Sequence, residues 1–465
     1  MFAEIVVNTH QDPAKKFFTY RIPKELERGV NLGSEVLVPF GKRSVEGYVF
    51  EIKTTRPPFP TKEIKGLRGK AFTAAQVKLA RWMSAYYAAP PLDCLKCQLP
   101  GRGQRYSEGK ENEVETLLLV PYAVQVRIKA LELNRAERRT TLIGSRSVVF
   151  APLPKLKRII IEEPENWTYK DERSPYYHAK DVAQKRAELE GLKLELRYLV
   201  PRAEDALPLR ALPTLPSPIK IIDLQKERDT GNPPAGGHGF SQLSIEAVKA
   251  FRQMGSSDAG LVFVNSREAK EKIRQAVKEQ NLDANKIEIA GAEIFGQAGK
   301  KYAAVVVSDT DTLFNLPDFR SHEKLLLIIT KLAQLTKGDV FLQTANATHP
   351  LFEELETGNL KGFYERELQD RKPLMYPPFG ALAKLEFSAK TTAKVESEAQ
   401  RLYKKLLTNQ LPTIFVSPPY PPYAKTRGRV QLNIAVKARS RRELGKALTL
   451  VPSSWKIIID PESLL

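Results

Sequence analysis

Apolar and polar residues alternate along several short runs in the first hundred residues, as they do in β-strands. In the run 34–40, Val36, Val38 and Phe40 occupy every second position, which gives a strand one apolar face. Similar runs, AEIVV, FFTYRI and EGYVFEI, are separated by proline, glycine and charged turn residues. The pattern predicts a small β-barrel or sheet at the start of the chain.

A helix is predicted next, from about Thr73 to Ala88. Its apolar residues recur at helical spacing and form one broad side that a core would bury. Pro90 and Pro91 follow and end the helix, because proline cannot continue it.

Strand-like apolar runs alternate with helical ones from residue 106 to residue 370. The strand candidates are TLLLVP, RIIIEE, LKLELRYLV, IKIIDL, AGLVFVN and AAVVVSD. This alternation predicts parallel α/β sheets with helices on both faces. The proline-rich stretch 207–220 is the best linker candidate, so the region divides into two lobes there.

The last segment has a different order of elements. A strand, a helix, two strands, a helix and a strand are predicted at 382–388, 391–409, 412–417, 429–437, 440–451 and 455–460. This order is a split β-α-β, ferredoxin-like α+β pattern. Ser440 and Glu443 have the spacing of a capping box, which places the start of the second helix. The chain is thus predicted to be a multidomain α/β protein with domains 1–105, 106–206, 207–370 and 371–465.

Positive charge is concentrated at the two ends of the chain. The net charge of +19 divides into +9 for residues 1–105, +1 for 106–206, −2 for 207–370 and +11 for 371–465. Lysines and arginines that neutralise phosphates release counterions, so a basic excess confined to two domains favours nucleic acid as the partner. A solvated basic surface is the alternative.

Membrane and metal proteins fit the sequence less well. No apolar run reaches the roughly 18 residues of a membrane span, and residues 1–16 have no signal-peptide core, so we expect a cytoplasmic protein without a membrane partner. The sequence has two cysteines, Cys94 and Cys97, whereas a structural zinc normally takes four ligands. We therefore expect no metal and interpret this Cys-x-x-C as an ordinary helix end.

A series of strings, in the right order, resembles the primosomal protein N′ (PriA) family of replication-restart helicases. They include GSEVLVPFGKR, LARWMSAYYAAPP, SPYYHAKDVAQKRA, FYERELQDRKPLMYPPFG and the closing DPESLL. The resemblance covers nearly the whole chain. It implies an N-terminal 3′ DNA-binding domain followed by two RecA-like helicase lobes, in agreement with the charge distribution and the two predicted lobes.

The family's nucleotide site is what this chain lacks. A P-loop lysine reaches phosphate oxygens and the following Ser or Thr binds Mg²⁺, yet no Gly-Lys pair in this sequence is followed by Ser or Thr. The family's winged helix and P-loop are missing before TLLLVPY, and its zinc-binding insertion is missing as well. The ATP, Mg²⁺ and zinc of the family are therefore expected to be lost as cofactors.

Two further helicase motifs have changed. The family's Mg²⁺-binding and water-activating box aligns with Glu162 and Glu163, followed here by Pro164 and Glu165 in place of Glu and His. We interpret Glu162 and Glu163 as vestigial, with no catalytic residue left. Leu335 takes the place of the first arginine finger, a group worth about 10³ to 10⁵ in rate. The resemblance thus implies two degenerate helicase lobes.

Four positions match the family's pocket for a 3′-terminal nucleotide, namely Phe18, Thr19, Gly41 and Lys65. The resemblance implies that the Phe stacks on a base, the Gly lets the backbone approach and the Lys meets a phosphate. Thr19 departs from the family, which has an Asp there to accept a hydrogen bond from a 3′-hydroxyl. The alternative is that Phe18 and Gly41 serve a core and a turn.

Other DNA contacts are predicted on the turn beside Gly41 and on a loop near the end of the chain. Lys42 and Arg43 are the candidates beside Gly41. The loop PPYPPYAKTRGR interleaves aromatic rings with cations, which suits stacking on a single strand and phosphate contact, although a proline-stiffened surface loop is the alternative. Its candidates are Tyr420, Tyr423, Lys425, Arg427 and Arg429.

Three residues match the family's pocket for the C-terminal tail of single-stranded-DNA-binding protein. Trp82 and Tyr86 are four residues apart on the predicted helix and so project from one side, and Arg441 lies in the first turn of the last helix. The tail ends in acidic residues and a Phe, which aromatic rings and an arginine suit. The alternative is that Trp82 belongs to a core and Arg441 is solvated.

The sequence therefore predicts a non-catalytic protein that binds forked or 3′-ended single-stranded DNA and meets other primosome proteins. One alternative is an ATP-dependent 3′-to-5′ helicase with an unusual nucleotide site. Another is a protein adaptor whose positive ends bind acidic partners.

Overall fold

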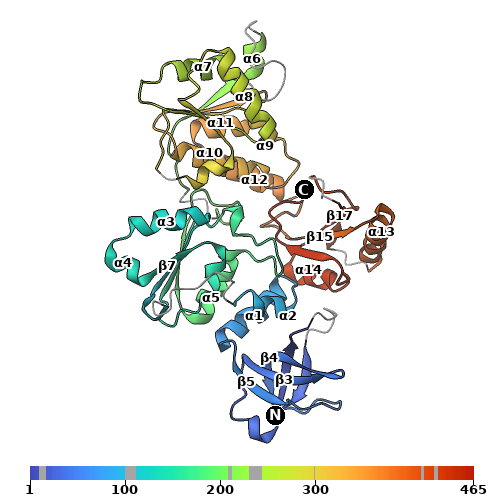
Figure 1. Cartoon of the computed structure of the whole chain (residues 1–465). Coiled ribbons are helices and arrows are strands. Elements are labelled where there is room, and N and C mark those ends of the chain that lie inside the picture. Colours follow the sequence, from blue (N-terminus) through green and yellow to red (C-terminus); the bar gives the residue numbers. More distant parts are fainter. Residues whose placement is uncertain are drawn as a thin grey trace. The chain divides into compact units, whose positions relative to one another are not determined.

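The computed structural model describes residues 1–9, 17–99, 111–207, 212–229, 243–297, 299–409, 413–423 and 428–465. They form two compact units. The first unit contains residues 1–121, 129–197 and 380–461, and the second contains 122–128, 198–379 and 462–465. Figure 1 labels the elements along the chain. Among the described residues, no helix has both the length and the apolar character needed to cross a membrane.

The chain begins with a five-stranded antiparallel sheet in the order β2-β1-β4-β3-β5. Its strands are β1 (Phe2–Val7), β2 (Phe18–Arg21), β3 (Ser34–Phe40), β4 (Arg43–Lys53) and β5 (Gly66–Lys70), with the short helix η1 (Lys24–Leu26) between β2 and β3. The predicted alternation in β3 is confirmed, because Val36 and Val38 are fully buried. An isolated bridge from Arg21 to Glu63 links the end of β2 to the chain that leads into β5. The closed barrel stays a prediction.

The predicted helix after this sheet is α1 (Ala74–Tyr86), and α2 (Pro91–Lys96) follows it. Thr73 begins α1 because its side chain and that of Gln76 cap each other's backbone N–H groups. One side of α1 enters a large apolar cluster of the first unit that also contains Leu119 and Leu385. This cluster brings α1 together with parts of the chain that are far away in sequence.

A four-stranded parallel sheet in the order β7-β6-β8-β9 occupies the next part of the chain. Its strands are β6 (Thr116–Leu119), β7 (Thr141–Gly144), β8 (Arg158–Glu162) and β9 (Lys193–Arg197). The central strands are almost continuously apolar, as expected where both faces of a parallel sheet are covered. The helical segments between β6 and β9, and just before β6, are η2 (Glu111–Glu113), α3 (Ala123–Glu132), α4 (Arg135–Thr140), η3 (Arg146–Phe150), η4 (Trp167–Tyr169) and α5 (Ala179–Glu190).

A second parallel sheet, in the second unit, has the order β10-β14-β13-β11-β12. Its strands are β10 (Ile219–Asp223), β11 (Gly260–Phe263), β12 (Ile287–Ala290), β13 (Ala304–Val307) and β14 (Val340–Thr344). Its helices are α6 (Leu224–Asp229), α7 (Ile245–Arg252), α8 (Arg267–Glu279), η5 (Ala292–Gly296), α9 (Thr310–Phe314), α10 (Ser321–Gln334), α11 (Pro350–Thr357) and α12 (Leu360–Arg371). The predicted parallel α/β character of the middle of the chain is thus observed.

A buried ionic cluster holds several segments of the second unit together. Arg371, at the end of α12, pairs with Glu204 at 3.2 Å, Glu323 at 2.6 Å and Glu367 at 2.8 Å. Arg320 pairs with Glu204 at 2.6 Å and with Glu323 at 3.0 Å. The side chain of Arg371 is only 2% exposed. Removal of a single partner would therefore leave an uncompensated charge in the interior.

The last part of the chain forms a four-stranded antiparallel sheet in the order β16-β17-β15-β18. Its elements are β15 (Ala381–Ala389), α13 (Thr392–Thr408), β16 (Ile414–Val416), β17 (Val430–Ala438), α14 (Arg441–Leu448) and β18 (Lys456–Ile459). Each lies where the sequence placed it, to within three residues at either end. Ser440 caps α14 by accepting a hydrogen bond from the Glu443 backbone N–H.

Candidate nucleic-acid interface

Phe18 and Gly41 meet at one end of the N-terminal sheet. The ring of Phe18 on β2 lies edge-on to Phe40, with 5.1 Å between ring centroids, and both rings pack against the core of the sheet. Gly41 follows Phe40 in the tight turn between β3 and β4 and has a φ of +59°, which favours glycine. A Cβ atom on Gly41 would meet no atom within 4 Å. The surface above this turn is therefore open.

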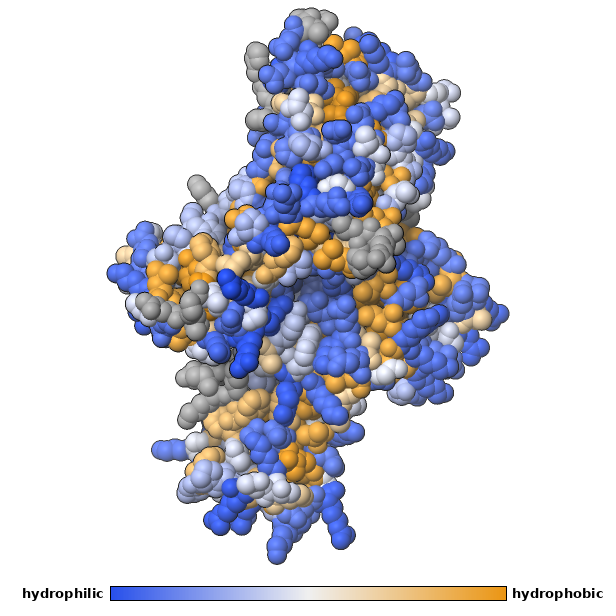
Figure 2. All heavy atoms as spheres, turned by 180° about the vertical axis from the view of Figure 1, so that it is seen from behind, coloured by the Kyte–Doolittle hydropathy of each residue, from blue (hydrophilic) through white to orange (hydrophobic). Residues whose placement is uncertain are grey.

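Basic residues surround the same turn. Lys42 and Arg43 are exposed, and Lys65 donates a hydrogen bond from Nζ to Oγ of Ser44 at 2.8 Å. Figure 2 shows hydrophilic side chains over much of one face of the molecule. The structure thus brings the predicted residues Gly41, Lys42, Arg43 and Lys65 to one hairpin.

Thr19 lies apart from the ring of Phe18. Successive side chains of a strand point to opposite faces, and the neighbours Phe18 and Tyr20 both pack on the core side. Thr19 stands opposite Glu4 of β1 on the other face. The side chains of Phe18 and Thr19 therefore lie on opposite faces of β2.

Trp82, Tyr86 and Arg441 come together as predicted, although α1 and α14 are far apart in sequence. The rings of Trp82 and Tyr86 stack with 4.8 Å between centroids and 28° between planes. The guanidinium of Arg441 lies 4.3 Å above the Tyr86 ring, and its Nη2 donates to the Tyr86 hydroxyl at 2.9 Å. Nη1 of Arg441 is buried and has no hydrogen-bond partner among the described residues.

Carboxylates that the sequence did not reveal complete this cluster. Asp460, directly after β18, forms a salt bridge with Arg441. Burial opposes the charge of Arg441, but Asp460 and the neighbouring Tyr86 raise its pKa overall. Burial raises the pKa of Tyr86, and Asp181 and Asp460 raise it further. Arg441 therefore stays cationic beside a neutral aromatic pair, a combination that suits an acidic ligand with an apolar end.

The C-terminal loop is described only in part. Tyr420 forms a bridge with Asn433 of β17, Tyr423 is 69% exposed, and Arg429 donates to the Ser388 carbonyl at 3.3 Å. The predicted contacts Lys425 and Arg427 lie outside the described residues.

Glu162 stands at the carboxyl end of β8, where helicases of the resembled family hold Mg²⁺. Its two oxygens pair with Lys129 at 3.2 Å and with Arg197 at 3.6 Å. Burial lowers the pKa of Lys129, but hydrogen bonds and charge from Glu132 and Glu162 raise it overall. Glu162 thus has two cationic partners, which it shares, since Lys129 also pairs with Glu132 at 3.0 Å and Arg197 with Glu195 at 2.7 Å. Within the described ranges, no group of three His, Cys, Asp or Glu side chains could hold a metal ion.

Glu163 and Leu335 have structural contacts of their own. Glu163 accepts a hydrogen bond from the Asn166 amide at 3.0 Å, and its backbone N–H donates to the Arg197 carbonyl at 2.9 Å. Leu335 ends α10, and its carbonyl accepts from the Tyr302 N–H at 2.8 Å.

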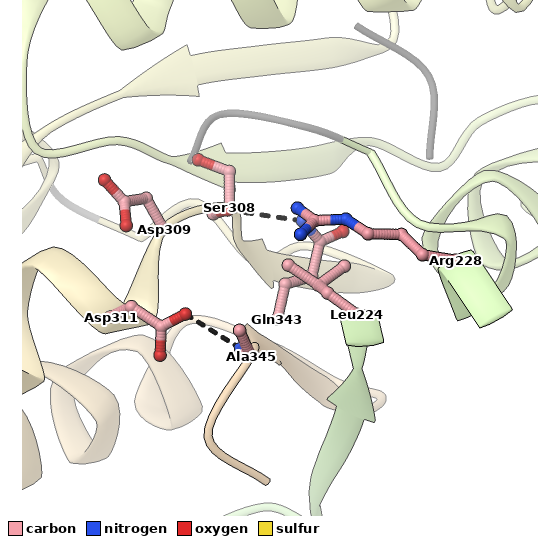
Figure 3. A pocket seen from close by; sticks show the side chains of 7 residues that line it. All are labelled: Leu224, Arg228, Ser308, Asp309, Asp311, Gln343 and Ala345. Atoms are coloured by element: carbon pink, nitrogen blue, oxygen red, sulfur yellow. Dashed lines mark hydrogen bonds between the residues drawn. The ribbon is translucent and has the colours of Figure 1, made fainter. Parts of the chain in front are cut away.

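A small pocket of about 120 Å³ lies at the carboxyl ends of β10, β13 and β14 (Figure 3). Protein donors already satisfy its carboxylates. Asp311 accepts from the backbone N–H of Ala345 at 2.8 Å and from the Asn346 amide at 3.0 Å, and Asp309 caps α9. No pattern in the sequence predicted this pocket. Its lining is Leu224, Arg228, Ser308, Asp309, Asp311, Gln343 and Ala345.

Residues 4–100 match the family model of the PriA 3′DNA-binding domain. The chain is 23% identical to the replication restart protein PriA of Bacillus subtilis, over 72% of this chain and 54% of that protein. It is 23% identical to PriA of Treponema pallidum, over 65% of this chain and 60% of that protein. The chain thus spans only about half the length of several curated relatives that it matches.

One relative aligns from end to end. PriA of Rickettsia conorii is 21% identical over 97% of this chain and 98% of that protein. The alignment is 654 positions long, which exceeds the 465 residues of this chain, so the Rickettsia protein has long segments without a counterpart here.

Among solved structures, the yeast DEAD-box splicing factor Prp28 matches 62% of this chain and 78% of that chain at 9% identity, with a TM-score of 0.17. A score this low carries no argument about the fold. The alignments with the PriA proteins, in contrast, extend over most of this chain. The resemblance stated from the sequence is thereby confirmed: this chain is similar in sequence to PriA proteins, and its residues 4–100 match the 3′DNA-binding domain of PriA.

Proposed function

We propose that this protein binds forked or 3′-ended DNA in replication restart and has no helicase activity of its own. The observation that carries the proposal is the match of residues 4–100 to the PriA 3′DNA-binding domain. The charge of the chain supports it, because the excess of Lys and Arg falls at the two ends and leaves the middle nearly neutral.

The domain organisation is part of this proposal. Residues 1–105 hold the 3′ end, 106–206 and 207–370 are degenerate helicase lobes, and 371–465 form a second DNA-binding domain. Two parallel sheets in the middle of the chain and an antiparallel sheet at each end are compatible with this division.

Three places in the chain support the proposed lack of ATP hydrolysis. The sequence has no P-loop to hold the phosphates. Lys129 and Arg197 pair with Glu162 and thus meet the charge that a metal ion would otherwise neutralise. Leu335 has no charge to offer a phosphoryl group. The helicase alternative requires a nucleotide site built from other residues, and no observation favours one.

Binding of a fluorescent fork at increasing salt tests the DNA-binding part of the proposal. Affinity should fall steeply and linearly on a logarithmic salt scale, because phosphate contacts release counterions. Lys42→Glu with Arg43→Glu in one variant should weaken binding at every salt concentration, and Lys24→Glu with Arg28→Glu is the matched control away from the hairpin. A wild-type protein that does not bind the fork at low salt would contradict the proposal and favour an adaptor for acidic proteins.

A protein partner follows from the Trp82, Tyr86 and Arg441 cluster. In the resembled family these positions receive the tail of single-stranded-DNA-binding protein, which ends in acidic residues and a Phe. The stacked rings and the cationic Arg441 suit such a tail. We therefore include this tail, and through it other primosome proteins, among the proposed partners.

A further inference from the structure

The carboxylate of Asp460 already occupies the cationic end of the cluster of Trp82, Tyr86 and Arg441. Nη2 of Arg441 donates both to the Tyr86 hydroxyl and to Oδ2 of Asp460, and the hydroxyl donates in turn to Oδ2 at 3.4 Å. The other terminal nitrogen, Nη1, is buried. As the protein stands, neither terminal nitrogen of Arg441 is therefore open to the carboxylate of a ligand.

The rest of this cluster is accessible from outside. Trp82 and Tyr86 are both only partly buried, so part of their stacked surface is in contact with solvent. The side chain of Arg441 is 37% exposed and that of Asp460 is 24% exposed. A ligand that reaches the two rings therefore meets the Asp460 carboxylate beside them, and this carboxylate can turn into water by rotation of its own side chain.

A second carboxylate favours the departure of Asp460. Asp181 on α5 accepts a hydrogen bond from the Tyr87 hydroxyl at 3.1 Å. Burial raises the pKa of the Asp181 carboxyl, and the negative charge of Asp460 raises it further, although Lys180 opposes this. Like charges that are close together repel each other. The pair of Asp460 with Arg441 is therefore formed against a repulsion, which makes Asp460 a replaceable partner.

We propose that Asp460 is an internal competitor in this pocket and determines which ligands it accepts. Asp460 holds Arg441 in the free protein, and the carboxylate of an acidic ligand has to displace it. This selection rests on the tail site that the proposed function includes, and it adds how that site distinguishes one acidic ligand from another.

The selection follows from an exchange of like for like. A ligand carboxylate that replaces Asp460 takes over the same donors, Nη2 of Arg441 and the Tyr86 hydroxyl, so the exchange itself contributes little free energy. Burial of an apolar side chain against the two rings has to supply the rest. A ligand that is only acidic is therefore rejected, whereas one that places an aromatic ring beside its carboxylate is accepted.

Asp460→Asn in the full-length protein tests this competition. Asp460 has a φ of +46°, a left-handed conformation that Asn also adopts, so the change removes the charge and keeps the backbone. An acidic peptide that ends in Phe should bind this variant about 3- to 30-fold more tightly than it binds the wild type. Its affinity should also fall more steeply with salt, because binding then forms a new ion pair instead of exchanging one.

Two further proteins and a second peptide complete the experiment. Glu396→Gln is the matched control, because it removes one negative charge from an exposed position on α13, and it should bind like the wild type. Arg441→Gln should cancel the gain when it is combined with Asp460→Asn. The same acidic peptide ending in Ala should show measurable binding to Asp460→Asn but not to the wild type.

The outcomes separate this inference from the proposed function. If Asp460→Asn binds the Phe-ended peptide no more tightly than Glu396→Gln does, the competition is wrong and the tail site stands. Weaker binding by Asp460→Asn would also overturn the competition, because Asp460 would then orient Arg441 for the ligand. If neither the wild type nor Asp460→Asn binds either peptide, the tail site and the competition both fail, and fork binding by the same samples still decides the DNA-binding function.

Discussion

At the scale of single residues, the most informative arrangement is the cluster of Trp82, Tyr86 and Arg441. The sequence indicated that all three belong to one site, and the structure places the Arg441 guanidinium 4.3 Å above the Tyr86 ring. Asp460 was not predicted, because a single acidic residue after a strand has no distinctive pattern. Its salt bridge fixes the orientation of Arg441. The cluster therefore combines an apolar surface with a held cation.

We expect Trp82→Ala and Arg441→Glu each to weaken binding of an acidic, Phe-ended tail peptide by about 1 to 3 kcal/mol. One change removes the ring surface and the other reverses the charge. Fork-DNA affinity should barely change. Isothermal titration with the peptide checks this, and Arg442→Glu is the matched control, because Arg442 is exposed and next in the chain. Equal peptide binding by the wild type and both variants would show that this side of α1 only packs in the core and binds no peptide.

A second prediction concerns Thr19. We expect a weak preference for a free 3′ end, and Thr19→Asp should sharpen it by returning an anionic acceptor. Thr19→Asn, which is similar in size but uncharged, is the control. Because Thr19 stands opposite Glu4, the Asp variant should also lose roughly 0.2 to 1 kcal/mol of stability from like-charge repulsion. The measurement is fork binding with the 3′ end free or blocked. If blocking never matters in any of the three proteins, the pocket assignment fails.

At the scale of elements, the sequence predicted local structure well wherever periodicity and caps agree. The helix expected near 73–88 is α1, begun by Thr73, and the helix expected from Ser440 is α14. The face of a side chain was harder to predict. Phe18 and Thr19 are adjacent on β2, so their side chains point to opposite faces of the sheet. The family resemblance, in contrast, implied that both line one pocket.

The ionic cluster around Arg371 was invisible to sequence patterns because its members come from three segments that are far apart in the sequence. We expect Arg371→Met to destabilise the protein by about 3 to 5 kcal/mol, since three glutamates lose a buried partner. Urea unfolding followed by circular dichroism measures this. Arg366→Met is the control, because Arg366 pairs with Glu354 outside the cluster and is 20% exposed. If Arg371→Met lowers the free energy of unfolding by less than Arg366→Met does, the cluster does not stabilise the second unit as proposed.

The same cluster predicts a dependence of stability on pH. Burial would raise the pKa of Glu367, but its hydrogen bond to His322 and the charge of Arg371 lower it overall. A carboxylate with a lowered folded pKa adds stability above its unfolded pKa of about 4.3, and this stability is lost as the pH falls through the folded pKa. We expect the urea concentration at the midpoint of unfolding to fall as the pH is lowered below about 4.3. In Glu367→Gln this fall should be smaller. If the urea midpoint of Glu367→Gln depends on pH as steeply as that of the wild type, Glu367 is not a cause of the pH dependence.

At the scale of the whole molecule, the proposed function joins DNA binding to the absence of ATP hydrolysis. The relatives share the order of segments along the chain, whereas the sequence has no P-loop. The structure adds the ion pairs of Glu162 with Lys129 and Arg197, which no sequence pattern revealed because the three residues come from separate elements. Both observations support the proposal that the protein has no ATPase activity of its own.

ATP hydrolysis by the full-length protein, in the presence of a fork that it is shown to bind in the same sample, tests this account most directly. Without a P-loop or a first arginine finger, the rate should equal the buffer background with and without the fork. Glu163→Gln should leave that background unchanged. DNA-stimulated hydrolysis that Glu163→Gln abolishes would contradict the account and identify the protein as an ATP-dependent enzyme with an unusual nucleotide site.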